Sequence, residues 1–369
     1  MSYIKQLDSL RGIAVLLVVL SHWVPNSSFQ WGAFLGVNTF FVLSGFLISS
    51  ILFLNKEEAE VAGYSKLVVL KNFFFRRALR IFPIYFFVVI TLYVLGEDSI
   101  PAINYDIKYL LTFTINFHIF LVKHYGKYTA HFWSLAVEEQ FYFMWPWLML
   151  FLRRKYLLVA ILFIILTGSI SEIFIRDPFE YILTYNCFNA FGVGALLAWV
   201  YIYRPQFLKK TFPLLSYLIL TEFGIIFLML FGWLPSIFPL RTLLSPMAIW
   251  IISYVILNLN SSKKLKFSFI LNNSQLIFIG KISYGVYLYH IYIPYITANF
   301  LYYLENTLQN SLKPYAFLLY FLSNFCITIL LSRLSWRFVE IPTMRFKRYF
   351  EYQKPDSSSA SEKFTYRTF

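Results

Sequence analysis

Three ionisable residues interrupt the first apolar stretch of the chain, LDSLRGIAVLLVVLSHWV at residues 7–24: Asp8, Arg11 and His22. At about 100° per residue they share one face of a helix, with Arg11 and His22 close to three whole turns apart. An imidazole accepts protons near neutral pH, which makes His22 a candidate catalytic base. Arg11 is suited to hold an anion, and Asp8 to pair with Arg11. The alternatives are a structural histidine and an arginine that anchors the helix in the membrane.

A second polar group lies in HFWSLAVEEQFYFMWPW at residues 131–147. Helical spacing places Ser134 and Glu138 on one face, directed toward the interior of a helix bundle. A carboxylate inside a membrane is costly without a partner or a role, so Glu138 is a candidate catalytic residue. Ser134 and Glu139 are candidate substrate-binding residues, with a solvated interfacial patch as the alternative for the two glutamates.

Arginines crowd into RRALRIFP at residues 76–83, where Arg76, Arg77 and Arg80 stand within two turns of a helix. A guanidinium group binds a phosphate through two parallel hydrogen bonds, so the cluster suits a phosphorylated cytosolic ligand. The alternative is anchoring of a span end by positive charge on the cytoplasmic side of a membrane.

The stretch GKISYGVYLYHIYIP at residues 280–294 aligns Tyr284, Tyr287 and His290 on one helical face. Tyr287 and His290 are candidate substrate-binding residues, and His290 is a second buried histidine that can line the same cavity as His22. Tyrosines in such a place more often serve packing than chemistry, which is the alternative.

The elements that must position these residues are membrane helices. Of the 369 residues, 59% are hydrophobic and only 14% are charged, far from the balance of a soluble domain. The formal charge of +14 does not indicate a nucleic-acid partner, because the basic residues lie between apolar runs and not on one face or tail. The two cysteines, Cys187 and Cys326, have no metal-ligand spacing, and no metal site is expected.

Apolar runs predict an all-α polytopic membrane protein with a bundle of about ten transmembrane helices, at residues 7–24, 33–54, 81–95, 133–152, 156–175, 181–203, 212–234, 242–259, 276–301 and 315–334. We also expect an amphipathic surface helix at 64–80 and a short re-entrant or interfacial segment at 109–122. The distribution of basic residues places both termini in the cytoplasm and leaves few basic residues, Arg241 among them, in the outer loops. Residues 1–350 form the transmembrane domain, and 351–369 a disordered tail.

Several motifs in order along the chain resemble those of the acyltransferase 3 family of bacterial integral membrane acyltransferases. They are LDSLRG, the spacing of Arg11 and His22, FFVLSGFLIS, RRALRIFP, FWSLAVEEQFY, ISYGVYLYH and VEIP. The resemblance implies acyl transfer from cytoplasmic acyl-CoA to a surface carbohydrate, with Arg11, His22 and Glu138 as functional residues. An arginine motif binds the donor in the family and usually reads Arg-x-Arg, whereas Leu79 interrupts it here. Which of the three arginines act therefore stays open. A C-terminal SGNH hydrolase-like domain occurs in some members, and we expect the stand-alone type here.

Acyl transfer from a thioester to a sugar hydroxyl needs a base and groups that stabilise the oxyanion. His22 would be the base, and a carboxylate, Glu138 or Asp8, would fix its tautomer. Arg11 lies roughly 16 Å from His22 along a helix at ~1.5 Å per residue, a length comparable to an extended pantetheine arm. We therefore expect acetyl-CoA to bind as donor at the cytoplasmic side of the membrane and a glycan to bind as acceptor at the outer side.

The expected partners are membrane lipids, acyl-CoA and a cell-surface glycan, possibly lipid-linked, such as lipopolysaccharide O-antigen, in the bacterial inner membrane. The alternative from another class is a polysaccharide or lipid exporter, whose buried charges would line a transport path. Inverted repeats, which would favour an exporter, are not evident. A membrane scaffold would leave Arg11, His22 and Glu138 without a purpose.

Overall fold

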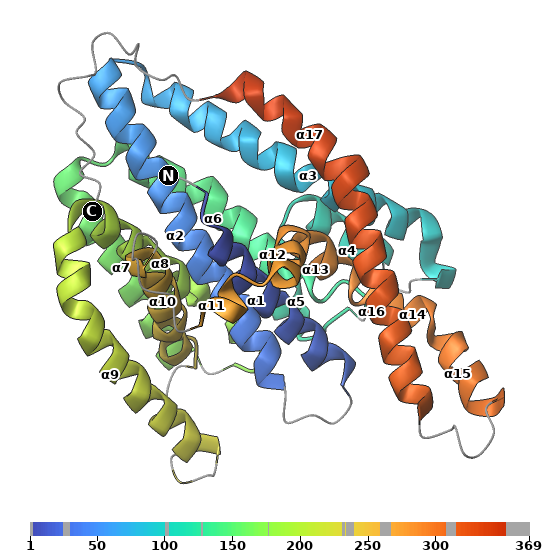
Figure 1. Cartoon of the computed structure of the whole chain (residues 1–369). Coiled ribbons are helices and arrows are strands. Elements are labelled where there is room, and N and C mark those ends of the chain that lie inside the picture. The colour runs from blue at the N-terminus through green and yellow to red at the C-terminus, as the bar shows by residue number, and fades with distance from the viewer. Residues whose placement is uncertain are drawn as a thin grey trace.

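The computed structural model describes residues 3–24, 30–99, 103–126, 128–175, 177–230, 233, 240–258, 267–307 and 315–351. Every regular element in these ranges is helical (Figure 1). By length and composition, seven helices of the described chain can cross a membrane: α2, α3, α7, α8, α9, α10 and α16. The prediction of an all-α polytopic membrane protein is therefore confirmed. The predicted tail at 351–369 lies outside the described residues, apart from Glu351.

The helices of the described chain have the following order. The first are α1 (Lys5–Trp23), α2 (Gln30–Ala62), α3 (Lys66–Ser99), α4 (Ile103–Leu111), α5 (Ile115–Val122), α6 (Phe132–Phe151), α7 (Arg154–Phe174), α8 (Phe188–Tyr203), α9 (Pro205–Leu230) and α10 (Leu240–Asn258). The others are α11 (Ser268–Leu271), α12 (Ser274–Lys281), α13 (Ser283–Tyr289), α14 (Tyr292–Ile296), α15 (Ala298–Thr307), α16 (Ala316–Ser335), a π-helical turn (Trp336–Glu340), α17 (Ile341–Arg345) and a final 3₁₀ turn (Phe346–Phe350).

The predicted surface helix at 64–80 and the predicted span at 81–95 are one continuous helix, α3, of 34 residues. The prediction of two separate elements was wrong. Its amphipathic half buries Leu70 and Phe73 against the bundle instead of resting on lipid headgroups. At ~1.5 Å per residue α3 is about 50 Å long, well beyond the ~30 Å of a hydrocarbon core. It therefore carries its arginines from one end of the bundle toward the centre.

The predicted span at 276–301 is also not a single helix, because it is divided into α12, α13, α14 and α15. The first of these helices, α12, packs closely on α1. A Cβ atom on Gly280 would overlap the carbonyl oxygen of Asp8, and one on Gly12 would overlap that of Leu276. Small residues let two helix backbones approach this closely. The contact fixes the end of α1 that carries Asp8 and Arg11.

The short apolar segment at 109–122 is broken between α4 and α5. Phe113, at the break, has a φ of 52°, in the left-handed region that ends a helix. Each helix is too short to cross a bilayer, which agrees with a re-entrant or interfacial segment.

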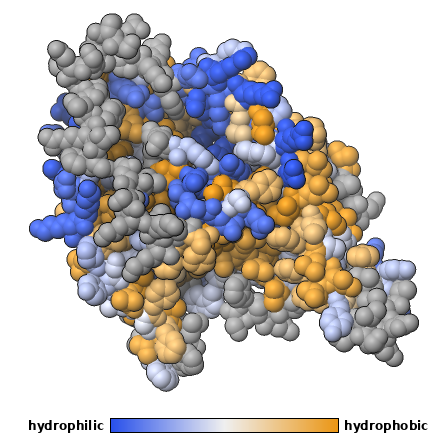
Figure 2. All heavy atoms as spheres, in the orientation of Figure 1, coloured by the Kyte–Doolittle hydropathy of each residue, from blue (hydrophilic) through white to orange (hydrophobic). Residues whose placement is uncertain are grey.

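The core of the bundle lies where α2 crosses α1, α8 and α6. Gly45 of α2 and Gly194 of α8 have no room for a Cβ atom, so these helices meet backbone to backbone. In Figure 1, α17 runs beside α3 together with the turns that flank it, whereas α16 packs on α13. Figure 2 shows an apolar flank over α16 and hydrophilic residues gathered toward the end where α17 finishes, as expected of a protein that lies across a membrane.

Candidate functional site

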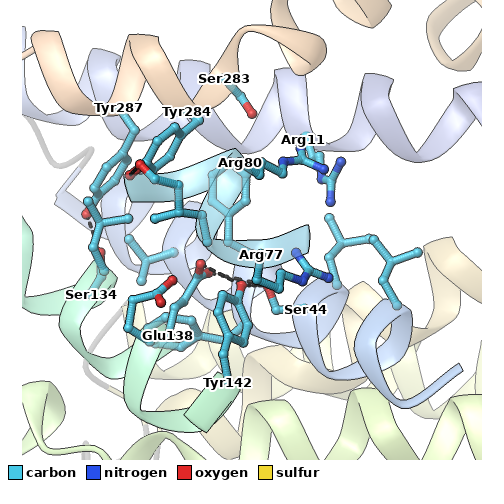
Figure 3. A pocket seen from close by; sticks show the side chains of 18 residues that line it. Arg11, Ser44, Arg77, Arg80, Ser134, Glu138, Tyr142, Ser283, Tyr284 and Tyr287 are labelled. Atoms are coloured by element: carbon cyan, nitrogen blue, oxygen red, sulfur yellow. Dashed lines mark hydrogen bonds between the residues drawn. The ribbon is translucent and has the colours of Figure 1, made fainter. Parts of the chain in front are cut away.

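A narrow polar cavity lies at the centre of the bundle, between α1, α2, α3, α6 and α13 (Figure 3). Its volume is about 90 Å³. The polar side chains in its wall are Arg11, Ser44, Arg77, Arg80, Ser134, Glu138, Glu139, Tyr142, Ser283, Tyr284 and Tyr287. The structure thus brings residues from five of the motifs into one wall, and we call this space the central cavity.

Three wider cavities share lining residues with the central cavity. The arginine cavity, of about 530 Å³, shares Arg77 and Arg80 and also contains Arg76 and Lys347. The N-terminal cavity, of about 470 Å³, shares Arg11 and Arg80 and also contains Asp8. The histidine cavity, of about 350 Å³, shares Val37 and Tyr287 with the central cavity and contains His22, His131 and Arg241. The arginine and N-terminal cavities therefore adjoin the central cavity at Arg80, and the histidine cavity adjoins it at Val37 and Tyr287.

The three arginines of α3 differ in what they contact. Arg76 donates through Nη1 to the carbonyl oxygens of Lys347, at 3.1 Å, and Phe350, at 3.4 Å, so it ties α3 to the end of the last described turn. Arg77 and Arg80 line both the arginine cavity and the central cavity. Neither of them has an ion pair within the described part of the chain. They are the pair free to bind an anion.

Glu138 lies in a hydrogen-bonded cluster beside Arg77. Tyr142 donates to Glu138 Oε2 at 2.8 Å, and Ser44 donates to Oε1 at 3.4 Å. The guanidinium carbon of Arg77 lies 5.1 Å from the centre of the Tyr142 ring. In Figure 3, Glu138, Tyr142 and Arg77 lie together on one side of the cavity. This carboxylate can therefore hold the arginine at the mouth of the central cavity.

Asp8 and Arg11 form the expected ion pair, with Nη1 of Arg11 3.3 Å from Oδ1 of Asp8. Asp8 also accepts a hydrogen bond from the hydroxyl of Tyr3, just before α1. Burial and this hydrogen bond raise the pKa of Tyr3 to about 12, so the phenol stays a donor. Arg11 reaches the central cavity, and Asp8 stays in the N-terminal cavity.

His22 is held by a backbone carbonyl and by a second histidine. Its Nδ1 lies 2.9 Å from the carbonyl oxygen of Val18 and 3.3 Å from Nε2 of His290. Nδ1 of His290 lies 2.7 Å from the carbonyl oxygen of Tyr287. Because a carbonyl only accepts, both Nδ1 atoms carry the hydrogen, and Nε2 of His22 keeps its lone pair.

The expectation that Glu138 or Asp8 fixes the tautomer of His22 is therefore wrong. The hydrogen-bond partners of Glu138 are Tyr142 and Ser44, and those of Asp8 are Tyr3 and Arg11. Asp8 is paired with Arg11, and Glu138 lies in the same cavity wall as Arg77. The imidazole, which faces the histidine cavity, is oriented without a carboxylate.

Tyr287 stands between the central and histidine cavities and lines both. Its hydroxyl donates to the carbonyl oxygen of His131 at 3.0 Å and lies 2.6 Å from Oγ of Ser134. His290 is fully buried, with its ring centre 5.0 Å from that of His22, and it is not in the wall of any of the four cavities described above. Glu139 lies in the central cavity wall, away from the histidines.

Sequence reasoning missed two residues of the histidine cavity. His131 shares a helical face with Ser134 and its ring centre lies 5.3 Å from that of His290, so the helical spacing contained the signal. Arg241 was assigned to a loop, whereas it is the second residue of α10 and only 1% exposed. No sequence pattern distinguishes this arginine from a residue that anchors a span end.

The fold and the site define a polytopic membrane protein with adjoining cavities in its helix bundle, in whose walls arginine, glutamate, tyrosine and histidine side chains meet. Residues 4–333 match the family model described as an acyltransferase domain (Acyl_transf_3), and the chain belongs to this family, as its motifs predicted. No solved structure matches the chain.

Several curated proteins are similar to this chain. A protein named "Putative O-acetyltransferase" from Staphylococcus aureus strain COL is 30% identical, over 93% of this chain and 57% of its own length. The O-acetyltransferase OatA of S. aureus strain NCTC 8325 / PS 47 is 29% identical, over 92% of this chain and 57% of its own length. The chain thus spans a little over half the length of these relatives.

Proposed function

We propose that this protein is a membrane O-acyltransferase that moves an acetyl group from acetyl-CoA to a hydroxyl of a cell-surface glycan. The observation that carries the proposal is the succession of cavities from Arg77 and Arg80 to the free Nε2 of His22. Family membership supports acyl transfer, and the names of the relatives support acetyl as the group.

The donor enters at the arginine cavity, where Arg77, Arg80 and Lys347 offer positive charge to the phosphates of CoA. The central cavity, of about 90 Å³, suits an extended thioester arm. Arg11 is eleven residues before His22 on α1, roughly 16 Å away at ~1.5 Å per residue. An arm of this length brings the thioester from the arginines to the histidine cavity.

In the transfer step, Nε2 of His22 removes the proton from the acceptor hydroxyl as its oxygen attacks the thioester carbonyl carbon. The carbon–sulfur bond then breaks, and the proton on His22 passes to the leaving thiolate of CoA. Tyr287 borders both cavities, and it can donate to the developing oxyanion once its hydroxyl leaves the carbonyl of His131. His290 and the Val18 carbonyl keep the lone pair of His22 on Nε2.

The same proposal assigns sides to the membrane. The arginine cavity faces the bacterial cytoplasm, where acetyl-CoA is made, and the histidine cavity faces outward. Basic side chains that gather at the arginine end, in α3 and in the turns after α17, agree with this orientation. Both termini then lie in the cytoplasm, and the acceptor is an exported glycan, either free or lipid-linked.

The alternative of a polysaccharide or lipid exporter finds no support in the dimensions of the route. A sugar chain would have to pass the central cavity, the smallest of the four in volume at about 90 Å³. Movement of glycan across vesicles in the absence of acetyl-CoA would favour the exporter.

Transfer is tested in proteoliposomes with labelled acetyl-CoA and glycan from the host cell. We expect His22→Ala to insert normally and to transfer no label, and Arg80→Ala to raise the KM for acetyl-CoA. Arg76→Ala is the matched control, because Arg76 is bonded to backbone carbonyls and should change that KM little. Normal transfer by His22→Ala would overturn the mechanism. Mass spectrometry of host glycans with and without the protein should show the mass of one acetyl group.

A further inference from the structure

A permanent positive charge lies in the wall of the histidine cavity. Arg241 and His22 both line this cavity. The other residues that line the cavity include no carboxylate, lysine or arginine. The side chain is 1% exposed. The proposed transfer step does not use it.

The contacts of Arg241 fix its position without neutralising its charge. Nη2 donates to the carbonyl oxygen of Tyr181 at 2.8 Å. The guanidinium carbon lies 4.8 Å from the centre of the Phe34 ring and 5.4 Å from that of Phe41. These contacts hold the guanidinium group against the cavity wall.

Glu172 is the carboxylate bonded to the backbone of Arg241, and its oxygens are occupied there. Its oxygens accept from the backbone N–H of Arg241 at 2.7 Å, from the N–H and hydroxyl of Thr242, and from the amide of Asn189. It thus caps the first turn of α10, where a carboxylate is favourable and a cation is not. Glu172 forms no ion pair with the guanidinium group among the described residues.

The guanidinium group also has a donor to spare. Nη1 of Arg241 is buried and has no hydrogen-bond partner within the described ranges. A buried cation without a counterion is costly, and a neutral side chain could serve the Tyr181 carbonyl equally well. A charge kept at this cost beside an acceptor cavity indicates an anionic ligand.

We propose that Arg241 binds an anionic group of the acceptor, a carboxylate or a phosphate, and so holds its hydroxyl beside His22. The inference rests on the proposed function. The cavity, at about 350 Å³, is within the range of small-ligand sites and has room for a sugar residue. The half-buried ring of Phe34 lines the cavity and lies over the guanidinium group of Arg241. This ring must therefore turn aside before an anion can reach Nη1.

The test is a ligand-observed NMR titration of the full chain in nanodiscs with glucose, glucuronate and glucose 1-phosphate at constant ionic strength. We expect at least one anionic sugar to bind with a Kd about tenfold or more below that of glucose, the value for one charge-assisted hydrogen bond. Arg241→Gln should remove the difference, and Arg241→Lys should keep part of it. Preference for glucuronate indicates a carboxylate, and preference for glucose 1-phosphate a phosphate.

The matched control is Arg77→Gln, which keeps the anion preference if the sugar binds at Arg241 and loses it if the sugar binds in the arginine cavity. The latter result would overturn the proposal. Equal binding of the three sugars by the unmodified protein would also overturn it, whether or not the Arg241 variants fold. Anion binding that depends on Arg241 in a protein without acetyl transfer would sustain the site and refute the proposed function instead.

Discussion

Replacing His290 by leucine removes the imidazole that accepts from Nδ1 of His22 and leaves the rest of the histidine cavity in place. The backbone of His290 is held independently, since Nε1 of Trp23 donates to its carbonyl oxygen at 2.7 Å. Leucine fills a similar volume but accepts no hydrogen bond. We therefore expect a folded variant whose base is less well oriented.

The magnitude follows from the contact that is lost. Nε2 of His290 lies 3.3 Å from Nδ1 of His22, and His22 becomes a cation once it has taken the acceptor proton. A hydrogen bond to a charged group contributes about 1.5–3 kcal/mol. Because the carbonyl of Val18, at 2.9 Å, still accepts from the same nitrogen, the lower end applies. At ~1.36 kcal/mol per factor of ten, kcat should fall about tenfold in His290→Leu.

The assay is steady-state transfer from labelled acetyl-CoA in proteoliposomes, with KM for donor and acceptor measured separately. A positioning role predicts a fall in kcat with both KM values little changed. His290→Gln, whose amide can accept from His22 and donate to the Tyr287 carbonyl, should recover most of the rate. An unchanged kcat in His290→Leu, or a glutamine variant as slow as the leucine variant, would refute the reasoning.

Three further outcomes are expected. Glu138→Gln keeps an oxygen for its hydrogen bonds but loses the charge beside the α3 arginines, so its kcat/KM for acetyl-CoA should fall about tenfold in the same assay; an unchanged value would exclude a role in placing the arginine. Gly280→Ala should lower the thermal unfolding temperature in detergent by several degrees, because its Cβ meets the backbone of α1, whereas Gly224→Ala, with open space around it, should not lower it. The hydrogen bond from Lys123 holds the pKa of Asp177 below its ordinary value, so the stability from this pair is present at neutral pH and is lost as pH falls through the lowered pKa. Asp177→Asn should therefore be slightly less stable than the unmodified protein at pH 7 and equal to it in strong acid, and a difference that persists there would contradict this assignment.

Residues close together on one helix were predictable from the sequence. The pair of Asp8 and Arg11 forms as expected, since three-residue spacing places both side chains on one helical face. The same reasoning brought Ser134 and Glu138 into one cavity wall. The arginine cluster was located, but its three members could not be distinguished from the sequence. Arg76 differs from the other two because it donates to the carbonyls of Lys347 and Phe350, in the last described turn, which packs on α3.

Composition and apolar periodicity thus indicated the all-helical membrane fold of this protein. Helical spacing indicated the local pairs, and the motifs indicated the family. Only the tertiary structure showed which segments are continuous, as in α3, and which are broken, as in α12 to α15. It also showed the backbone contact of Gly280 with α1. It also decided that the partner of His22 is His290, 268 residues away, and that Arg241 lies in a cavity wall. Spacing on one helix fixes a direction around that helix, whereas a contact between helices depends on how the whole bundle packs.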